Sequence, residues 1–413
     1  MLQHAETVIV GAGQAGLALS HWLTAAGHDH VLLERGRVAE RWRSERWDSL
    51  ALLTPDWANG LPGERSPVEP DRFRTGPEFV ADLERYAASF RAPVHEQTTV
   101  LRAERRSNGD YWVRTDRGAW LTRNLVVASG DCAVPATPWF APSAPADVAQ
   151  LHAARYSSPA RLAPGGVLVV GSGPSGHQIA HELAVAGRRV VMATGKHARI
   201  PRRYRGRDIW AWLHEIGHLT RTLDELPHDP RAHVQAALPL DGRDGGRTVD
   251  LLTLAQAGVR IAGRLEGFAG SHALLGIGLQ AAIADADRRL RRLLDRIDAH
   301  IAQRPDRHAI PPAEPFVPVE IPSGPPSLDL AAEAVRTIIW ATGFRRHYPW
   351  LQVPGRGPDG DVAHVRGVTD VPGLYVLGQR WQHRMISHQI GGVGDDARYV
   401  ADCIAGRWAD AAA

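Results

Sequence analysis

Short apolar runs, glycine-rich turns and a helical repeat alternate in the first part of the chain. An apolar run covers 7–10, a glycine-rich turn covers 11–16, helical spacing extends over 17–26, and a second apolar run covers 31–33. Continuous apolar runs of this length are typical of buried strands in a parallel sheet. The order of strand, tight turn, helix and strand therefore predicts a mononucleotide-binding unit.

The same pattern recurs further along the chain. A strand is predicted over 167–170, a second glycine-rich turn over 171–176, a helix over 178–186 and a strand over 190–192. Each turn has the spacing G-x-G-x-x-G and stands between a predicted strand and a predicted helix. One such match is a weak signal, whereas two matches in the same local context predict two dinucleotide-binding sites.

The rest of the pattern predicts elements that connect and complete these two units. They are a loop at 72–76, a helix over 78–90, strands within 94–113 and 119–128 around a turn at 107–110, proline-rich connectors at 135–145 and 311–326, a long amphipathic helix over 279–301, strands over 337–340 and 374–377, and a last helix from about 395. We attribute the apolar stripe of the long helix to core packing alone.

These elements predict an α/β fold with two Rossmann-like dinucleotide-binding domains, of the three-layer ββα and βαβ types. The first domain is expected over 1–155. The second is expected as an insertion over 156–330 that includes the long helix, and 331–413 is expected to complete the first.

Composition narrows the class of protein. The 413 residues are 44% hydrophobic and 23% charged, which is typical of a folded soluble protein of two or three domains. A net charge of +3 does not indicate a nucleic-acid partner, and no apolar stretch is long enough to span a membrane. Cys132 and Cys403 form no C-x-x-C pair or zinc-type cluster, and the N-terminal segment is unlike a secretory signal. We therefore expect a cytoplasmic protein without a metal site.

The two turns supply the predicted phosphate contacts. In each, one glycine makes the turn, one lets the backbone approach a pyrophosphate, and one lets the helix pack on its strand, while the start of the helix faces the anion with free N–H groups. The residues assigned to these contacts are Gly11, Gly13, Gln14, Ala15 and Gly16 in the first turn and Gly171, Gly173, Pro174, Ser175 and Gly176 in the second.

The end of the second strand in each unit separates the two sites. Glu34 stands there in the first unit, and a carboxylate accepts both ribose hydroxyls but repels a 2′-phosphate, as suits the ADP half of FAD or NAD. Thr194 stands there in the second unit and is followed by a basic cluster of Lys196, His197, Arg199, Arg202 and Arg203, which includes the only lysine of the chain. From this cluster Lys196 and Arg199 are assigned to the 2′-phosphate of NADPH. A solvated basic loop is the alternative interpretation.

Further segments resemble the class B flavin monooxygenases, which are flavoproteins with two dinucleotide-binding domains and include amine- and sulfur-oxygenating enzymes and indole-pyruvate monooxygenases. The segments that carry the resemblance span almost the whole chain and are Glu34-Arg35, Arg41-Trp42, Leu53-Thr54-Pro55, Ala128-Ser129-Gly130, His152 to Tyr156 and Ala341-Thr342-Gly343-Phe344. The chain also departs from the pattern, because Gly378-Gln379 stands where related reductases have Gly-Asp, and because Ala146 and Val148 replace the leading Phe and Gly of a fingerprint. A full Baeyer-Villiger signature is missing.

The resemblance implies a reaction and its cofactors. NADPH reduces FAD, oxygen adds to the reduced ring to give a flavin C4a-hydroperoxide, and one oxygen atom passes to a nitrogen, sulfur or carbon centre of a small organic substrate. The cofactor contacts that it implies beyond the turns are Glu34, Arg35, Arg41, Trp42, Thr54, Val100, Ser129, Gly130, Gly378, Gly392, Ala341, Thr342 and Gly343. The expected partners are this substrate and O2, with no nucleic acid and no membrane, and a homodimer stays open.

No catalytic residue is assigned from the sequence. The substrate-side candidates are Asp56 and Asn59, which follow the segment resembling the flavin-ring stretch, and His383 and His388, which precede the last helix. The segment Gly391-Gly392-Val393-Gly394 would direct that helix at the flavin. Core packing for the histidines and a plain turn for the glycines are the alternatives. An NADPH-dependent flavin reductase or electron-transfer enzyme stays open as a second function, and a degenerate flavoprotein acting as a sensor or scaffold as a third.

Overall fold

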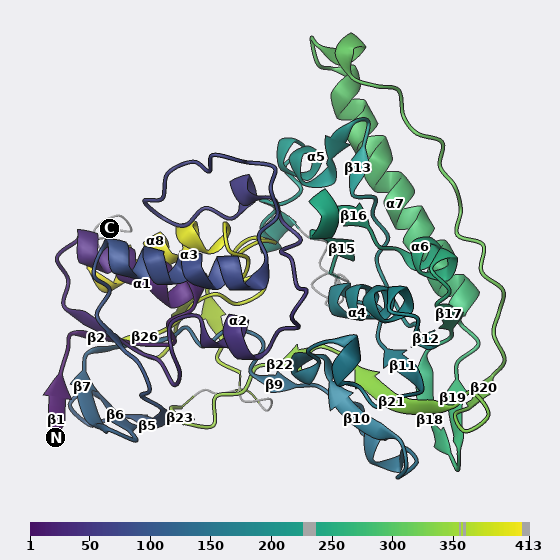
Figure 1. The fold of residues 1–413 in the computed structure, drawn as a ribbon. Coiled ribbons are helices and arrows are strands. Elements are labelled where there is room, and N and C mark those ends of the chain that lie inside the picture. The colour runs from purple at the N-terminus through teal and green to yellow at the C-terminus, as the bar shows by residue number, and fades with distance from the viewer. Residues whose placement is uncertain (226–236, 355–356, 358–360, 407–413) are drawn as a thin grey trace.

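The computed structural model describes residues 1–225, 237–354, 357 and 361–406. The chain forms two lobes that lie side by side in Figure 1. The N-terminus and the C-terminal helix both belong to the first lobe, which contains residues 1–135 and 344–406, and residues 136–343 form the second lobe. The two Rossmann-like units expected from the sequence are confirmed, one in each lobe.

A mostly parallel sheet forms the centre of the first lobe. Its strands, in spatial order, are β24 (His364–Val365), β25 (Val368–Thr369), β26 (Leu374–Val376), β8 (Asn124–Val127), β2 (Thr7–Val10), β3 (His30–Leu33) and β4 (Val94–His95). Val10 on β2 lies opposite Leu33 on β3 and Val127 on β8, so the three strands end at the same edge. A functional site at that edge is expected, because ligands of open α/β sheets bind beyond the carboxyl ends of the strands.

One face of this sheet is covered by helices and the other by a second sheet. The helices are α1 (Gln14–Ala25), α3 (Gly76–Ser89) and α8 (Val393–Ile404), and a short α2 (Glu40–Ser44) lies near them (Figure 1). The second sheet has the order β1 (Leu2–His4), β7 (Gly118–Thr122), β6 (Tyr111–Thr115), β5 (Val100–Arg105) and β23 (Leu351–Gln352). Tyr111 and Val113 on β6 pack against Val8 and Val31 in one buried cluster, which produces the expected ββα layering.

The second lobe is built on its own parallel sheet. Its strands, in spatial order, are β10 (Ala149–His152), β21 (Val335–Trp340), β11 (Gly166–Val170), β12 (Val190–Ala193) and β17 (Arg260–Ala262). The helices α4 (Pro174–Val185), α6 (Leu251–Gln256) and α7 (Leu279–Ala302) pack on one face, and the other face carries the small antiparallel sheet β18 (Leu265–Ala269), β19 (His272–Leu275) and β20 (Ser327–Asp329).

The domain boundaries differ from those expected. The boundaries at 155/156 and 330/331 placed β10 and β21 with the first domain, whereas β21 pairs with both β10 and β11 in the sheet of the second lobe. The reason is that Ile338 and Ile339 are buried on both faces and need neighbouring strands on both sides. The chain crosses between the lobes through β9 (Val134–Pro135) and β22 (Phe344–Arg345), which pair antiparallel.

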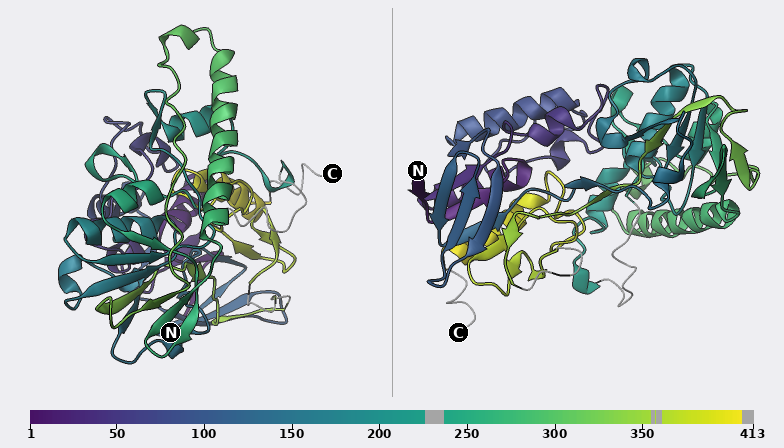
Figure 2. Two further views of the ribbon diagram at one scale, coloured as in Figure 1. Left: turned by 90° about the vertical axis from the view of Figure 1, so that its right-hand side faces the viewer. Right: turned by 90° about the horizontal axis from the view of Figure 1, so that it is seen from below.

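Smaller elements pack where the two lobes meet. They are β13 (Arg203–Tyr204), β14 (Arg207–Asp208), α5 (Ile209–Glu215), β15 (Leu240–Asp241) and β16 (Arg247–Thr248). The long helix α7 projects beyond the rest of its lobe in Figures 1 and 2. Its predicted apolar stripe is confirmed, since Leu279, Ile283 and Ile297 are buried. No helix in the described part of the chain is long and apolar enough to cross a membrane.

Candidate active site

A cleft of about 410 Å³ opens at the carboxyl edge of the first sheet. We call it the first cleft. It brings together most of the residues that the sequence assigned to FAD. Those that line it are Gly11, Gly13, Gln14, Ala15, Glu34, Arg35, Arg41, Trp42, Val100, Ser129, Gly130 and Gly378. Gly16 lies beneath the turn, where a Cβ atom would clash with the Gly11 carbonyl oxygen.

The first turn has room for a bound pyrophosphate. Gly11 has a φ of +112°, and a Cβ there would lie 2.7 Å from the Ala128 carbonyl oxygen, so only glycine makes this turn. A Cβ at Gly13 would meet nothing within 4 Å. Gly13 is also the N-cap of α1, and no side chain caps the first N–H groups of that helix. The free donors and the open space beside them fit a phosphate group.

Glu34 stands at one end of the first cleft. Its Oε2 atom accepts a hydrogen bond from the Ala12 N–H at 2.8 Å, and its Oε1 atom accepts one from the Gly36 N–H at 3.1 Å. The two backbone donors hold the carboxylate at the end of β3. Carboxylate lone pairs that these donors leave unused can accept ribose hydroxyls. The geometry therefore fits the adenosine end of a dinucleotide.

The second turn repeats this geometry in the second lobe. Gly171 has a φ of +110°, its Cβ would clash with the Ala341 carbonyl oxygen, and a Cβ at Gly173 would again meet nothing within 4 Å. Gly173 is the N-cap of α4, with Pro174 as the first helical residue. The second turn therefore fits a second pyrophosphate.

The basic cluster after β12 differs from the expectation. Arg199 was expected to meet a 2′-phosphate, but its Nε atom lies 3.0 Å from Asp250 and its Nη1 atom 2.7 Å from Asp287. Arg202 is buried against Asp208. These carboxylates compensate the two guanidinium charges, and the two partners of Arg199 come from segments that are distant in the sequence. Lys196 remains exposed at the end of β12.

A second cavity, of about 380 Å³, lies between the lobes. We call it the interlobe cavity. Much of its wall is apolar or aromatic and comes from Trp47, Leu50, Leu52, Leu53, Trp210, Phe344, Trp381 and Met385. Thr54 from the first lobe and Pro174 and Ser175 from the second turn also line it. A nicotinamide ring carried by the second turn and a small substrate therefore have access to the same space.

The first cleft and the interlobe cavity share a wall made of Gln14, Trp42, Arg46, Cys132 and His388. The Trp42 indole donates to the Gln14 amide oxygen at 3.2 Å, and the Arg46 guanidinium lies 5.0 Å from the centre of the Trp42 ring. Burial lowers the pKa of Arg46, and burial raises the pKa of the Cys132 thiol although Arg46 opposes that change. A flavin ring in the first cleft would meet the interlobe cavity at this wall.

His388 is the substrate-side candidate that the structure places at the site. Burial lowers its pKa to about 4, so the imidazole is neutral near pH 7. Its Nδ1 atom is buried and makes no hydrogen bond to another described residue. A neutral imidazole has one donor and one acceptor nitrogen, so the tautomer decides which kind of contact His388 offers a ligand.

The other substrate-side candidates lie elsewhere, and these assignments are corrected. His383 faces Asp396, with 3.9 Å between Nδ1 and Oδ1, and lines neither cavity. Asp56 accepts from Arg74 Nε at 3.0 Å, and with Asn59 it lines a separate pocket. Asn59 reaches the site only indirectly, because it accepts the Thr54 hydroxyl at 2.6 Å.

Gly392 and the second linker also lie outside both cavities. A Cβ at Gly392 would clash with the Ile386 carbonyl oxygen, and two acids, Asp395 and Asp396, occupy the first turn of α8. Close packing explains these glycines, and the acids oppose an anion at that helix end. Ala341, Thr342 and Gly343 support the lobe crossing, since Thr342 donates to Ala136 and Gly343 accepts from His152.

Residues 8–214 match the family described as pyridine nucleotide-disulphide oxidoreductase. The chain belongs to this family. It is 31% identical, over 98% of this chain and 99% of the relative, to an uncharacterized CzcO-like oxidoreductase of Geobacillus kaustophilus. It is 37% identical to indole-3-pyruvate monooxygenase YUCCA1 of Oryza sativa subsp. japonica, over 44% of this chain and 45% of that protein.

Solved structures share the fold of the whole chain. A flavin-containing monooxygenase from Stenotrophomonas maltophilia has a TM-score of 0.66 at 20% identity and covers 98% of this chain and 99% of its own. A bacillithiol disulfide reductase from Staphylococcus aureus has a TM-score of 0.58 at 11% identity, with coverage of 98% and 99%. The resemblance to class B flavin monooxygenases is confirmed. The chain is an oxidoreductase of the pyridine nucleotide-disulphide family, and the FAD and NADPH expected from the sequence fit this family.

Arg46 and Cys132 are site residues that the sequence analysis missed. Arg46 closely follows Arg41-Trp42, and Cys132 comes just after the Ser129-Gly130 linker. Both therefore neighbour segments that were already assigned to the flavin. The signal that could have found them is this proximity, together with the tendency of a strand end in such a sheet to line the site.

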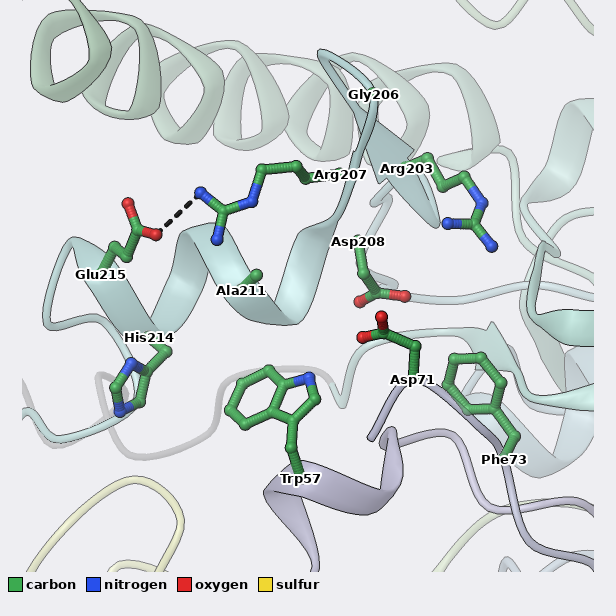
Figure 3. A pocket seen from close by; sticks show the side chains of 10 residues that line it. All are labelled: Trp57, Asp71, Phe73, Arg203, Gly206, Arg207, Asp208, Ala211, His214 and Glu215. Carbon is green, nitrogen blue, oxygen red and sulfur yellow. Dashed lines mark ion pairs between the residues drawn. The ribbon is translucent and has the colours of Figure 1, made fainter. Parts of the chain in front are cut away.

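A further pocket of about 440 Å³ is lined by residues of both lobes (Figure 3). Trp57, Asp71 and Phe73 approach it from the first lobe, and β13, β14 and α5 form the facing wall. Arg207 pairs with Glu215 at 2.7 Å along that wall. Most of its charges are compensated by neighbours, and we assign it no ligand.

Proposed function

We propose that the protein is an NADPH-dependent flavin monooxygenase that uses O2 to oxygenate a nitrogen, sulfur or carbon centre of a small organic substrate. The observation that carries the proposal is the wall shared by the first cleft and the interlobe cavity. A flavin ring, a nicotinamide and an apolar substrate could meet there, in a space partly walled by aromatic side chains.

Some residues of this chain would bind the cofactors, and others would enclose the substrate. Gly11, Gly13 and Glu34 would hold the ADP half of FAD, and Gly171 and Gly173 would hold the pyrophosphate of NADPH. When bound, FAD supplies the ring that takes hydride from NADPH and delivers electrons to oxygen.

The interlobe cavity would exclude water from the reacting atoms. Trp47 and Trp210 are buried in its wall, which limits the access of water that would divert the reaction to hydrogen peroxide. Arg46 would place a positive charge at the shared wall, and neutral His388 would offer a hydrogen bond to substrate or cofactor.

The similarity of the chain to flavin monooxygenases and its cysteine count both favour oxygen transfer over disulfide reduction. The sequence has only two cysteines, and both are free. Cys132 lines the shared wall, whereas Cys403 packs on the core of the first lobe around α1 and α8. No second thiol can therefore pair with Cys132 within the site. A flavin reductase that passes electrons to a quinone, a metal or a partner protein is the competing function.

The test uses the purified holoenzyme, NADPH and 18O2 with a panel of probes, namely an aryl methyl sulfide, a tertiary amine, an aromatic 2-oxo acid and a cyclic ketone. We expect one probe to accelerate NADPH oxidation and to yield a product with one 18O atom. The proposal is rejected if NADPH oxidation gives only hydrogen peroxide with every probe while a quinone accelerates it.

Two further points stay predictions. We propose the cytosol as the location, because both cysteines are free, as they are in reducing compartments. A homodimer is tested by light scattering of the purified protein across a concentration series.

A further inference from the structure

Asp131 lies where the middle of a dinucleotide must pass. In the first sheet, β3, β2 and β8 are neighbours in that order. Glu34 ends β3 at the adenosine side, the Gly11 turn ends β2, and Asp131 follows β8 and lines the first cleft. The next residue, Cys132, belongs to the wall shared with the interlobe cavity. Asp131 therefore stands between the phosphate turn and the ring end of the site.

The Asp131 carboxylate keeps unused acceptor capacity. Its Oδ2 atom accepts the Arg380 backbone N–H at 2.6 Å. Its Oδ1 atom is buried, makes no hydrogen bond to another described residue, and lies 3.6 Å from Arg346 Nε. The side chain is 22% exposed, on a wall of the cleft. A carboxylate offers about four lone-pair positions, so at least one remains for a ligand.

The negative charge of Asp131 in the first cleft is unfavourable unless something compensates it. FAD brings two phosphate charges into the same cleft, and a carboxylate close to them is unfavourable unless it accepts hydrogen bonds from the cofactor. The part of FAD between the pyrophosphate and the ring is a chain of alcohol groups, whose O–H donors match a carboxylate.

The end of the neighbouring strand β26 offers no competing acid. Gly378 lines the first cleft, but Gln379 is 2% exposed and its side chain turns into a buried network. Its Oε1 atom lies 2.9 Å from His364 Nε2 and accepts from Arg346. Arg346 also pairs with Asp361 at 3.1 Å, outside the cleft. Arg346 thereby links Gln379 to Asp131.

We propose that Asp131 is a flavin-binding residue whose carboxylate accepts a hydrogen bond from a hydroxyl of the ribityl chain of FAD, with Arg346 as its positioning residue. The assignment deepens the cofactor site. It rests on the binding of FAD, which the proposed function also requires, but it does not depend on oxygen transfer.

The test compares FAD with analogues that each lack one ribityl hydroxyl, by fluorescence titration of flavin-stripped full-length protein. We expect wild type to bind one analogue about tenfold more weakly than FAD, because hydrogen bonds to a charged acceptor contribute on this scale. Asp131→Ala should bind FAD about tenfold more weakly and lose the preference over that analogue. If Asp131→Ala keeps the wild-type preference, the assignment is wrong.

Two further variants separate binding from folding. Asp361→Asn removes the other carboxylate partner of Arg346 and leaves the cleft untouched, so it should keep the preference. Asp131→Asn keeps the shape of the side chain and serves if the alanine variant does not fold. Its preference should fall severalfold, and an unchanged preference would overturn the assignment. The titration contains no NADPH, oxygen or substrate, so its outcome is independent of a failure of the oxygenase proposal.

Discussion

At the scale of single residues, the two proposed cofactor sites differ in how charge is held at the end of the second strand of each unit. Backbone N–H groups fix the Glu34 carboxylate at the rim of the first cleft. In the second lobe, Lys196 is exposed just after the matching Thr194, whereas Arg199 is held by Asp250 and Asp287. Lys196 therefore has its charge available to a 2′-phosphate, and Arg199 has a structural role.

This difference predicts that substitutions of the two residues change different properties of the protein. Lys196→Ala should raise the KM for NADPH about tenfold, since one charge-assisted contact to phosphate is lost, and should leave the KM for NADH nearly unchanged. Arg199→Ala should lower the free energy of unfolding by about 3 kcal/mol, because it leaves two carboxylates without their partner, with similar effects on both nucleotides. Steady-state kinetics and urea unfolding measure the two effects. Equal changes in KM for both nucleotides in Lys196→Ala would contradict the assignment.

A buried histidine makes the second site sensitive to acid. His177, in the first turns of α4, is fully buried, its Nδ1 atom lies 3.1 Å from the Gly173 carbonyl oxygen, and burial lowers its pKa to about 4. The unfolded chain binds the proton near pH 6.5, so stability is full above that pH and falls as the pH drops toward 4.

The expected loss between pH 7 and pH 5 is about 2 kcal/mol for this one group. His177→Asn retains a donor for the Gly173 carbonyl but does not titrate, so its unfolding free energy should depend less on pH by that amount. Urea unfolding at both pH values measures the difference. His272→Asn, at an exposed histidine on β19, serves as the control and should behave as wild type. An acid loss in His177→Asn as large as in wild type would exclude this role.

At the scale of elements, the two glycine-rich turns are separate proposed phosphate-binding sites, one in each lobe. Gly13 and Gly173 both have open space where a Cβ would stand, and both have negative φ values of −87° and −82°. A larger residue therefore fits the backbone of the free protein and fills only the space that a pyrophosphate needs.

The matched pair Gly13→Val and Gly173→Val should separate the two cofactors. Gly13→Val should fold but purify without the yellow colour of FAD, because its side chain occupies the phosphate position. Gly173→Val should retain FAD but no longer be reduced by NADPH under anaerobic conditions. Visible absorbance and circular dichroism check both. Loss of FAD in Gly173→Val, with its fold intact, would show that the turns are not assigned correctly.

Elements set by local chemistry were predictable from the sequence, and those set by distant pairing were not. The turn at Gly11 is fixed by steric demands within a few residues, and both G-x-G-x-x-G units were predicted in place. The pairing of β10 with β21, which moved both domain boundaries, joins two neighbouring strands that are far apart in the sequence. The partners of Arg199 are similarly remote, at 51 and 88 positions from the arginine in the sequence.

Within a short segment, too, the sequence did not show which substrate-side candidate faces the site. His383 and His388 are five positions apart in an irregular segment, where no periodicity indicates which side chain faces a cavity. The structure turns His388 into the shared wall and His383 toward Asp396. Backbone pairing of Thr222 with Arg384, from the other lobe, helps to set this path, and sequence spacing does not reveal it.

At the scale of the whole molecule, the proposed reaction depends on how the two lobes are held together. The carbonyl oxygen of Leu53, in the first lobe, accepts from Arg202 Nη1 at 2.7 Å and from Trp210 Nε1 at 3.1 Å, both in the second lobe. Ser49 in turn donates to Glu182 at 2.8 Å. These contacts fix one wall of the interlobe cavity. Enclosure of the substrate therefore depends on contact between the lobes.

Loosening this contact should uncouple NADPH oxidation from oxygen transfer. Trp210→Phe keeps an aromatic ring in the wall but removes the N–H group that donates to Leu53. Water should then enter the cavity more often, and the fraction of NADPH electrons recovered as hydrogen peroxide should rise about twofold or more, while the affinity for FAD is unchanged. Trp139→Phe is the matched control, because Trp139 is 89% exposed and lines neither cavity. A peroxide assay alongside NADPH consumption measures the ratio. If both variants release the same fraction as wild type, the Leu53 contact does not govern enclosure, and the coupling between lobe contact and oxygen chemistry must be abandoned.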